Sequence, residues 1–489
     1  MKRIVQVIVA AALLTMLLSC SSYRHQQWRN TRTSQEDNEH YSLRFIESDD
    51  EGWFWDPQQA NDSMRLIRGK LENRKTLVVV FVHGWHHSAE CCDQNVEGFR
   101  NTLQQLSGMV KGFDVVGIYV GWRGRSLAGW LDYFTFWGRK SAAERVGQND
   151  LKEFLARLHD MYVEYRPDVC VQNQQPGCQQ ASGTPKNFMG LVSMGHSFGA
   201  QVLLRAVSGS MEDRLQHLNP VPAYLRTAQP ATPDPSVQHS LIGVGDLMVL
   251  INPAAEASQY HRLHMLARGL TYSEFQSPVM LVVSSENDWA RHRLFTIGRY
   301  LGEVFTGKPR KEDDIERVVE RQALGVFPGH ITHQLNPVDP KMELENQPVA
   351  RIPDKCPCKD GERVEWLKWK STPQVTKPNS LVPNDPKLRT FDFSGDVVFN
   401  GVELSPLTAK DIIDDKRWKD HAPALPYQPL IVATTSHSII EKHSGIFTDP
   451  FLHFLVPYIA YIEEKSLMNI TENVKVRQES ERAIQRSKQ

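Results

Sequence analysis

The chain has 489 residues, with 56 Lys and Arg against 57 Asp and Glu, so its formal net charge at neutral pH is −1. This balance offers no basic surface for nucleic acid and no general attraction to acidic partners, and we expect neither kind of partner. The length allows two or three average domains, but the order of the predicted elements favours one domain with insertions.

The first residues have the pattern of a secretory signal. Lys2 and Arg3 precede an apolar run over residues 4–18 that ends in Leu17-Leu18-Ser19-Cys20. The run is at the short limit for a bilayer span and is followed by small polar residues, which disfavours a spanning anchor. The ending resembles a bacterial lipobox. This resemblance implies removal of residues 1–19 and a lipid on the Cys20 sulfur, whereas an ordinary cleaved signal would leave Cys20 incidental.

Lipidation at Cys20 would hold the protein on a membrane of the bacterial cell envelope without spanning it. Ser21 follows the cysteine where an acidic residue could stand. By resemblance to Gram-negative lipoproteins, this favours the outer membrane, with the protein facing the periplasm.

Residues 20–75 are polar and are predicted to form a tether and an N-terminal extension, with a strand or two packed on the domain that follows. Regular structure begins at 77–82, an apolar β-branched run typical of a strand buried on both faces. Residues 95–110 have helical spacing of apolar side chains, and 114–122 give a second buried strand. Strand, helix and strand in this order predict the α/β class with a mostly parallel sheet.

The remaining elements repeat this alternation, and we expect the domain to cover residues 76–465. The predicted elements are a helix within 141–165, a strand at 188–195, a helix at 198–207, a strand at 246–254, a helix at 256–270, and strands at 278–285 and 429–436. Stretches near 208–240 and 306–425 interrupt the pattern and are predicted to be insertions that form a lid or cap. Residues 466–489 form a charged tail.

The motif Gly195-His196-Ser197-Phe198-Gly199 stands where a predicted buried strand turns into a predicted helix. A serine in that turn projects its hydroxyl, and the helix start offers backbone N–H groups to a developing negative charge. The alternative is a serine in an inert turn. The motif in this context resembles the α/β-hydrolase superfamily, in particular its serine esterases and lipases, over about residues 77–462.

The resemblance implies Ser197 as nucleophile and an oxyanion hole made by two backbone N–H groups. One belongs to Phe198, and the other to Trp85 in the loop His83-Gly84-Trp85 that ends an earlier strand. We expect His83 itself to brace this loop by hydrogen bonding rather than to transfer protons.

The resemblance also implies the order nucleophile, acid, histidine. Asp288 is the predicted acid because it lies a few residues past a strand end, and Glu286 is the alternative. Asp246 precedes its strand and would lie at the opposite end of the sheet.

Three histidines follow the last predicted strand: His437, His443 and His453. His453 falls within an apolar run of the closing helix, and His437 comes almost directly at the strand end. His443 stands a short loop before the helix that begins near Asp449-Pro450. We therefore assign the base to His443, with His437 as the alternative.

Disulfides are plausible in an exported chain, and Cys170 with Cys178 is the best local pair. A zinc site formed by Cys356 and Cys358 with His330 and His333 is conceivable, but the Cys-x-Cys spacing is unusual for zinc. We expect no cofactor and no metal.

The sequence thus predicts a membrane-anchored serine hydrolase that cleaves a carboxylic ester, in a lipid or an acylated envelope component, through an acyl-enzyme. The same three residues, Ser197, Asp288 and His443, would serve an acyltransferase. A third possibility is a lipoprotein scaffold that keeps the fold without catalysis.

Overall fold

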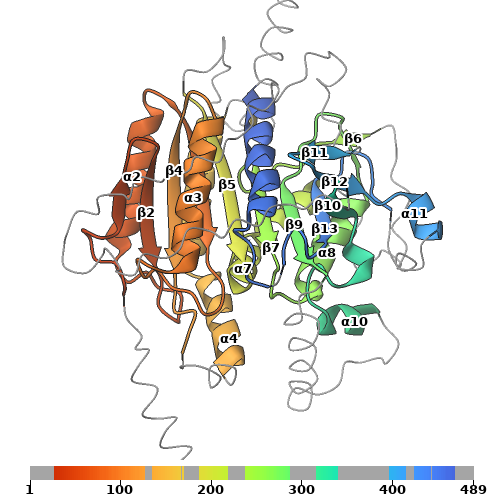
Figure 1. Ribbon diagram of the computed structural model, residues 1–489, viewed down its shortest axis with the longest axis horizontal. Coiled ribbons are helices and arrows are strands. Elements are labelled where there is room, and N and C mark those ends of the chain that lie inside the picture. Colours follow the sequence, from red (N-terminus) through yellow and green to blue (C-terminus); the bar gives the residue numbers. More distant parts are fainter. Residues whose placement is uncertain are drawn as a thin grey trace, which may run out of the picture.

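A single large sheet organises the chain (Figure 1). The computed structural model describes residues 27–126, 135–166, 168–169, 187–218, 237–286, 315–339, 396–414, 423–441 and 443–467. In these residues the sheet has eleven strands. In spatial order they are β1 (Gln35–Asp37), β2 (Tyr41–Glu47), β4 (Phe113–Gly121), β3 (Lys75–Val82), β5 (Met189–His196), β7 (Leu247–Ile251), β9 (Met280–Ser285), β13 (Leu430–Thr435), β10 (His333–Pro337), β12 (Val402–Pro406) and β11 (Val397–Phe399).

In this spatial order, each pair of adjacent strands from β2 to β10 is parallel. The sheet becomes antiparallel only at its edges, where β1 pairs with β2 and the β11–β12 hairpin pairs with β10. A short parallel pair, β6 (Gln238–His239) with β8 (Thr271–Tyr272), lies apart from it. The chain is therefore of the α/β class, with a mostly parallel sheet flanked by helices.

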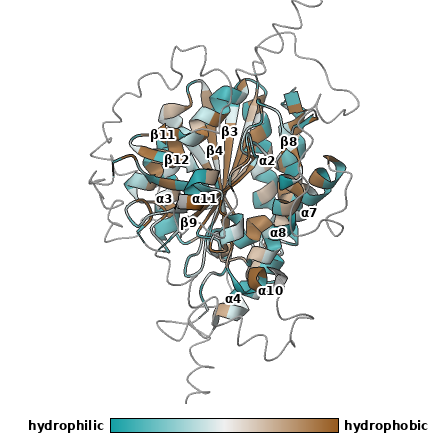
Figure 2. Cartoon of the chain, turned by 90° about the vertical axis from the view of Figure 1, so that its right-hand side faces the viewer, coloured by the Kyte–Doolittle hydropathy of each residue, from teal (hydrophilic) through white to brown (hydrophobic). Residues whose placement is uncertain are grey.

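Helices cover both faces of the sheet, as Figures 1 and 2 show. One face packs against α2 (Pro57–Leu71), α4 (Phe136–Val146), α5 (Asp150–Glu164), α7 (Phe198–Leu218) and α8 (Ala257–Arg268). The other face packs against α3 (Gln94–Met109) and a C-terminal helix over 449–467. The short helices α10 (Ile315–Arg321), η4 (Pro328–His330) and α11 (Ala409–Asp414) belong to the long segment between β9 and β13.

Strand β3 illustrates why a continuous apolar run forms a central strand. Successive side chains of a strand point to opposite faces, so a strand covered on both sides must be apolar at every position. Val78, Val80 and Val82 enter the core beneath α7, and Leu77, Val79 and Phe81 enter the core beneath α3. All six side chains are fully buried.

The order of the strands creates a switch point beside β3. The connection from β3 through α3 leads to β4 on one side, whereas β5 pairs with β3 on the other side and continues into α7 on the opposite face. In open parallel sheets such a point leaves a crevice at the carboxyl ends of the strands, which is where ligands bind. The carboxyl ends of β3 and β5 are therefore the place to look for a site.

Some element boundaries differ from those expected from the sequence. The single helix expected within 141–165 is divided into α4 and α5 at Gly147, where a Cβ would lie 2.5 Å from the carbonyl oxygen of Val202. Helix α7 continues to Leu218, into the stretch expected to be an insertion. The expected extension supplies β1, β2 and α2, and the expected insertion near 306–425 supplies three strands of the sheet.

Candidate active site

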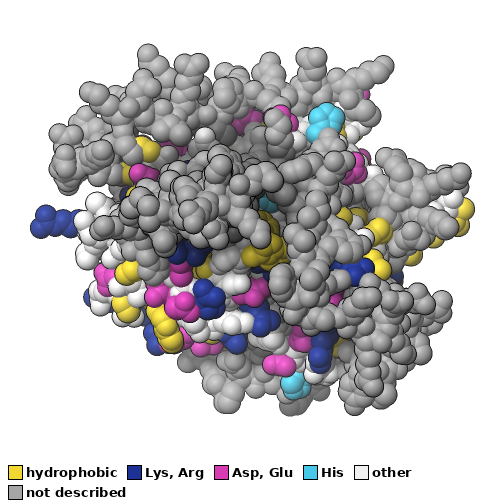
Figure 3. All heavy atoms as spheres, turned by 90° about the horizontal axis from the view of Figure 1, so that it is seen from below, with side chains coloured by type: hydrophobic (Ala, Val, Ile, Leu, Met, Phe, Trp, Pro, Cys, Tyr) yellow, Lys and Arg dark blue, Asp and Glu magenta, His cyan; other side chains and the backbone are white. Residues whose placement is uncertain are grey.

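Ser197 lies in a sharp turn between β5 and α7, at the carboxyl edge of the sheet (this edge faces the reader in Figure 3). Its φ angle is +55°, in the left-handed region that a serine seldom adopts. Gly199 makes the turn possible, because a Cβ at this position would overlap the backbone carbonyl group of Val82. Such a strained backbone is typical of functional sites and of the nucleophile turn expected from the sequence.

The structure brings His443 to Ser197. His443 Nε2 lies 2.7 Å from Ser197 Oγ, in the loop between β13 and the helix 449–467. With the ring proton on Nδ1, Nε2 accepts the hydroxyl hydrogen, which is the arrangement required of a general base. His437, the alternative base, is exposed, and His453 lies on the C-terminal helix.

Two further side chains hold the His443 loop in place. His196 Nε2 donates a hydrogen bond of 2.8 Å to the carbonyl oxygen of His443, and Asn252 Nδ2 donates a second one of 3.0 Å. His196 is the last residue of β5, and Asn252 directly follows the neighbouring strand β7. The carbonyl group of the candidate base is thereby fixed to the same strand ends that carry Ser197.

Asn252 also connects β7 to β9. Its φ angle is +45°, its backbone N–H donates to Val283 O at 2.8 Å, and its Oδ1 accepts from Ser285 N at 2.9 Å. Asparagine tolerates the left-handed region better than most residues, so it can combine this turn with two side-chain hydrogen bonds. These positioning roles of His196 and Asn252 were not predicted from the sequence, where Asn252 is marked only as an asparagine at a strand end, in "LINPA".

The predicted acid, Asp288, lies outside the described residues. The strand that leads to it is described: β9 ends at Ser285, next to β13, and Ser285 Oγ donates to the carbonyl oxygen of Ile440 at 2.9 Å. Glu286, the alternative acid, is exposed, and its carboxylate accepts from Thr434 Oγ1 at 3.5 Å. The end of β9 is therefore bound to the loop that carries His443.

The loop after β3 lies against Ser197. At Gly84, a Cβ would lie 2.8 Å from the carbonyl oxygen of His196 and 2.9 Å from Ser197 Cβ, so only glycine permits this approach. Trp85 follows in this loop, and Phe198 begins α7. The N–H of Phe198 is one of the first amides of a helix, which have no acceptor within the helix.

His83 braces this loop, as expected. Its Nδ1 donates to Gly84 O at 2.9 Å, its Nε2 accepts from Trp122 N at 3.0 Å, and its carbonyl oxygen accepts from Trp122 Nε1 at 2.9 Å. Complete burial lowers the pKa of His83 to about 4. The ring is therefore neutral and occupied with backbone groups.

Aromatic rings surround the two residues of the predicted oxyanion hole. Phe136, at the start of α4, has its ring centre 5.2 Å from that of Trp85 and 5.0 Å from that of Phe198. Helix α4 is held in this position by the buried Lys140, which forms an ion pair of 2.7 Å with Glu256 in the loop after β7. The site thus combines a serine, a histidine and apolar walls.

Asp246, which the sequence placed at the other end of the sheet, does not belong to the site around Ser197. Asp246 lies at the amino end of β7, where it pairs with Arg166 and accepts from Tyr162 Oη at 2.9 Å, far from Ser197 as expected.

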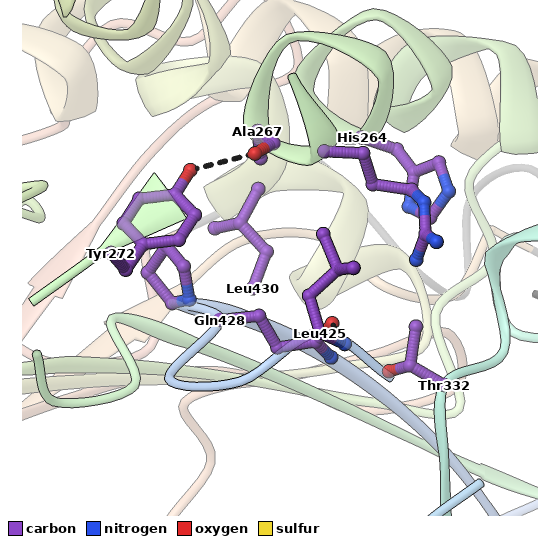
Figure 4. A pocket seen from close by; sticks show the side chains of 9 residues that line it. His264, Ala267, Tyr272, Thr332, Leu425, Gln428 and Leu430 are labelled. Atoms are coloured by element: carbon purple, nitrogen blue, oxygen red, sulfur yellow. Dashed lines mark hydrogen bonds between the residues drawn. The ribbon is translucent and has the colours of Figure 1, made fainter. Parts of the chain in front are cut away.

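A small pocket at the amino end of β13 lies between α8 and the residues around Leu430 (Figure 4). Tyr272, on its wall, donates to Ala267 O at 2.9 Å. This pocket is at the opposite edge of the sheet from Ser197.

The histidines of the conceivable zinc site are buried, whereas Cys356 and Cys358 lie outside the described residues, as do Cys170 and Cys178. His330 Nε2 is 3.0 Å from His261 Nδ1, and burial lowers the pKa of His330 well below its usual value. Within the described ranges, no three His, Cys, Asp or Glu side chains are grouped so that they could hold a metal ion.

Cys91 and Cys92 are both disulfide-bonded. Among the helices that the structure describes, none combines the length and hydropathy that a bilayer span requires.

Comparisons with known proteins add little. No protein-family model matches the chain, and no curated protein matches it. Among solved structures, the crystal structure of a C4-C4 SN3 tributyrin phosphonate inhibited by esterase B from Lactobacillus rhamnosis is similar at 15% sequence identity, with a TM-score of 0.17. The match covers 47% of this chain and 61% of that chain. A likeness this low carries no weight for the fold or the site, which rest on the geometry described above.

Proposed function

We propose that this chain is a serine hydrolase of the α/β-hydrolase type that cleaves a carboxylic ester through an acyl-enzyme. The hydrogen bond between Ser197 Oγ and His443 Nε2, made at a serine with a φ angle of +55°, carries the proposal. Two features support this class: a serine with a strained backbone between a strand and a helix, and a histidine in the loop after a later strand.

In the proposed reaction, Ser197 Oγ attacks the ester carbonyl carbon while its proton passes to His443 Nε2. The tetrahedral oxyanion accepts hydrogen bonds from the N–H groups of Phe198 and Trp85. Losing one such donor typically costs about 3 to 4 kcal/mol of transition-state stabilisation. His443 then gives its proton to the leaving alcohol, and a water molecule, activated by the same ring, releases the acid and restores Ser197.

Asp288 is the proposed acid, hydrogen-bonded to His443 Nδ1. Support comes from its position three residues beyond β9, because the end of β9 is bound to the base loop through Ser285 and Ile440. Asp288→Asn should then lower turnover by about four orders of magnitude, because a triad asparagine favours the wrong tautomer of the base. Glu286→Gln, at the exposed alternative position, is the matched control and should retain turnover.

We further propose that the protein is anchored at Cys20 in the outer membrane, faces the periplasm and acts on a lipid ester or an acylated envelope component. The signal segment and the lipobox-like ending support this. Cys20→Ala should release the chain from the membrane fraction or stop its processing. A mature protein that keeps Leu18 at its N-terminus would contradict the anchor.

A fluorophosphonate probe tests the enzyme class. We expect the probe to label the purified protein at Ser197 and not to label Ser197→Ala, which removes one hydroxyl and leaves the fold intact. A well-folded wild-type chain without label would favour a scaffold. Esters of increasing acyl length would then define the substrate, and products formed with added alcohols would identify an acyltransferase.

A further inference from the structure

Three exposed tryptophans stand at the edge of the sheet that carries Ser197. Trp53 and Trp55 belong to the loop between β2 and α2, and Trp137 lies in the first turn of α4. Their exposed fractions are 57%, 38% and 38%. Large aromatic side chains exposed on one edge indicate an interaction surface, and tryptophan is the residue type most typical of the boundary between a bilayer and water.

The loop with Trp53 and Trp55 is fastened to the helix with Trp137. Arg139 of α4 donates to both carboxylate oxygens of Asp50, at 2.7 and 2.8 Å, and Arg145 Nε donates to the carbonyl oxygen of Asp50 at 2.9 Å. The three tryptophans are therefore carried by one rigid assembly, which we call the tryptophan edge.

The tryptophan edge borders the candidate active site. The ring of Trp137 is 5.3 Å from that of Phe136, and Phe136 in turn packs against Phe198 and Trp85 beside the nucleophile. A surface that received the tryptophans would therefore also lie next to the approach to Ser197.

Two of the four acidic residues of the loop form ion pairs with arginine, whereas Asp49 and Asp56 accept backbone hydrogen bonds of 2.9 Å from Trp53 N and Gln58 N. Asp50 is paired with Arg123 and Arg139, and Glu51 lies 3.0 Å from Arg145 Nε. Figure 3 shows hydrophobic side chains among intermixed acidic and basic ones on this face. The arginines thus reduce the repulsion between this loop and an anionic surface, and the exposed aromatic rings supply apolar contact.

The chain also enters the domain at this edge. Glu47, the last residue of β2, accepts hydrogen bonds from Trp28 N at 2.9 Å and Arg29 N at 2.6 Å, and Arg29 Nε donates to Ala89 O at 2.6 Å. Gln27, where the described chain begins, lies seven positions after Cys20. A fully extended chain spans about 25 Å over seven positions. A lipid on Cys20 would thus keep this edge close to the membrane.

We infer that the tryptophan edge rests in the interface of a phospholipid bilayer, so that Ser197 faces the membrane. This orientation rests on the anchor proposed at Cys20. It presents the site directly to esters embedded in the bilayer, which need not cross the periplasm to reach the serine.

The experiment uses the full, lipidated chain in vesicles of equal parts phosphatidylethanolamine and phosphatidylglycerol, with or without bromine on the lipid acyl chains. Bromine quenches tryptophans that enter the bilayer. We expect brominated vesicles to quench part of the wild-type emission. Combined Trp53→Phe, Trp55→Phe and Trp137→Phe should clearly lower the quenched component, since these are the exposed tryptophans among the residues that the structure describes.

Phe275→Trp is the matched control. Phe275 is 56% exposed and precedes β9, at the opposite edge of the sheet, so a tryptophan there should add emission that the bromolipid does not quench. Labelling of Ser197 by a fluorophosphonate checks that each variant is folded, and it tests the hydrolase proposal separately.

The outcomes separate the two proposals. A chain that stays at the bottom of a flotation gradient would refute the anchor and the orientation with it. A chain that floats, yet is quenched equally in wild type and the triple variant, would overturn the orientation alone. Brominated vesicles could also fail to quench the wild type while the wild type forms a dimer that the triple variant does not form. This result would assign the tryptophan edge to contact with a second copy of the chain, and it would also overturn the orientation.

Discussion

Asn252 should be a positioning residue whose loss weakens turnover through His443. Asn252→Ala removes the hydrogen bond to His443 O and the one from Ser285 N, and it leaves that buried N–H without its acceptor. These losses cost about 2 to 4 kcal/mol. Alanine at a φ angle of +45° adds about 1 kcal/mol of strain, so the free energy of unfolding should fall by about 3 to 5 kcal/mol.

The effect on catalysis should be smaller than removal of the base. The carbonyl group of His443 keeps its hydrogen bond from His196, so the ring stays near Ser197 but is held less firmly. A misplacement of about 1 Å can cost a hundredfold in rate, and we expect kcat to fall between about tenfold and a hundredfold. KM should change little, because Asn252 faces the His443 loop rather than the approach to the serine.

Asn252→Gly separates the two contributions. Glycine adopts the left-handed region without strain, so this variant should be about 1 kcal/mol more stable than Asn252→Ala in urea unfolding. Both variants lose the same two hydrogen bonds and should show the same fall in kcat on a short-chain p-nitrophenyl ester. Full turnover in both variants would refute the positioning role, and a kcat that follows stability instead would show that it is only structural.

His443→Ala should lower turnover by several orders of magnitude without unfolding the protein, whereas His437→Ala, at an exposed position, should retain it; the reverse result would mean that the base lies elsewhere. Gly199→Ala should prevent the soluble, folded protein from accumulating, because the added Cβ overlaps the carbonyl group of Val82. A soluble variant with normal far-ultraviolet circular dichroism would contradict this. Acid should destabilise the fold through His83, whose folded pKa of about 4 is below its unfolded value. The contribution of the neutral His83 ring to the free energy of unfolding is complete above about pH 6.5 and decreases as the pH falls toward 4. At pH 5 about 2 kcal/mol of this contribution is lost. Urea midpoints that are equal at pH 7.5 and pH 5 would rule this out.

Much of the central sheet could be predicted because its strands are buried on both faces. A strand such as β3 must be apolar throughout, and this pattern is visible without knowing its neighbours. The edge strands β10 to β12 were hidden in the expected insertion. They are short, and their partly exposed residues leave no continuous apolar run.

The proximity of Ser197 and His443 followed from motif and chain order, but the residues that hold His443 did not. His196 and Asn252 act on a backbone carbonyl group, and such a contact leaves no pattern in the sequence around either residue. The break between α4 and α5 was also hidden, because it depends on contact between Gly147 and α7 rather than on local helix propensity.

The hydrogen bond between Ser197 and His443 joins residues 246 positions apart. Such a distant contact forms only after the intervening chain has been closed into place, so the strained serine turn can exist before its base arrives. Until β13 and the helix over 449–467 have docked, Ser197 therefore has no base, and the proposed chemistry becomes possible only as the last step of folding.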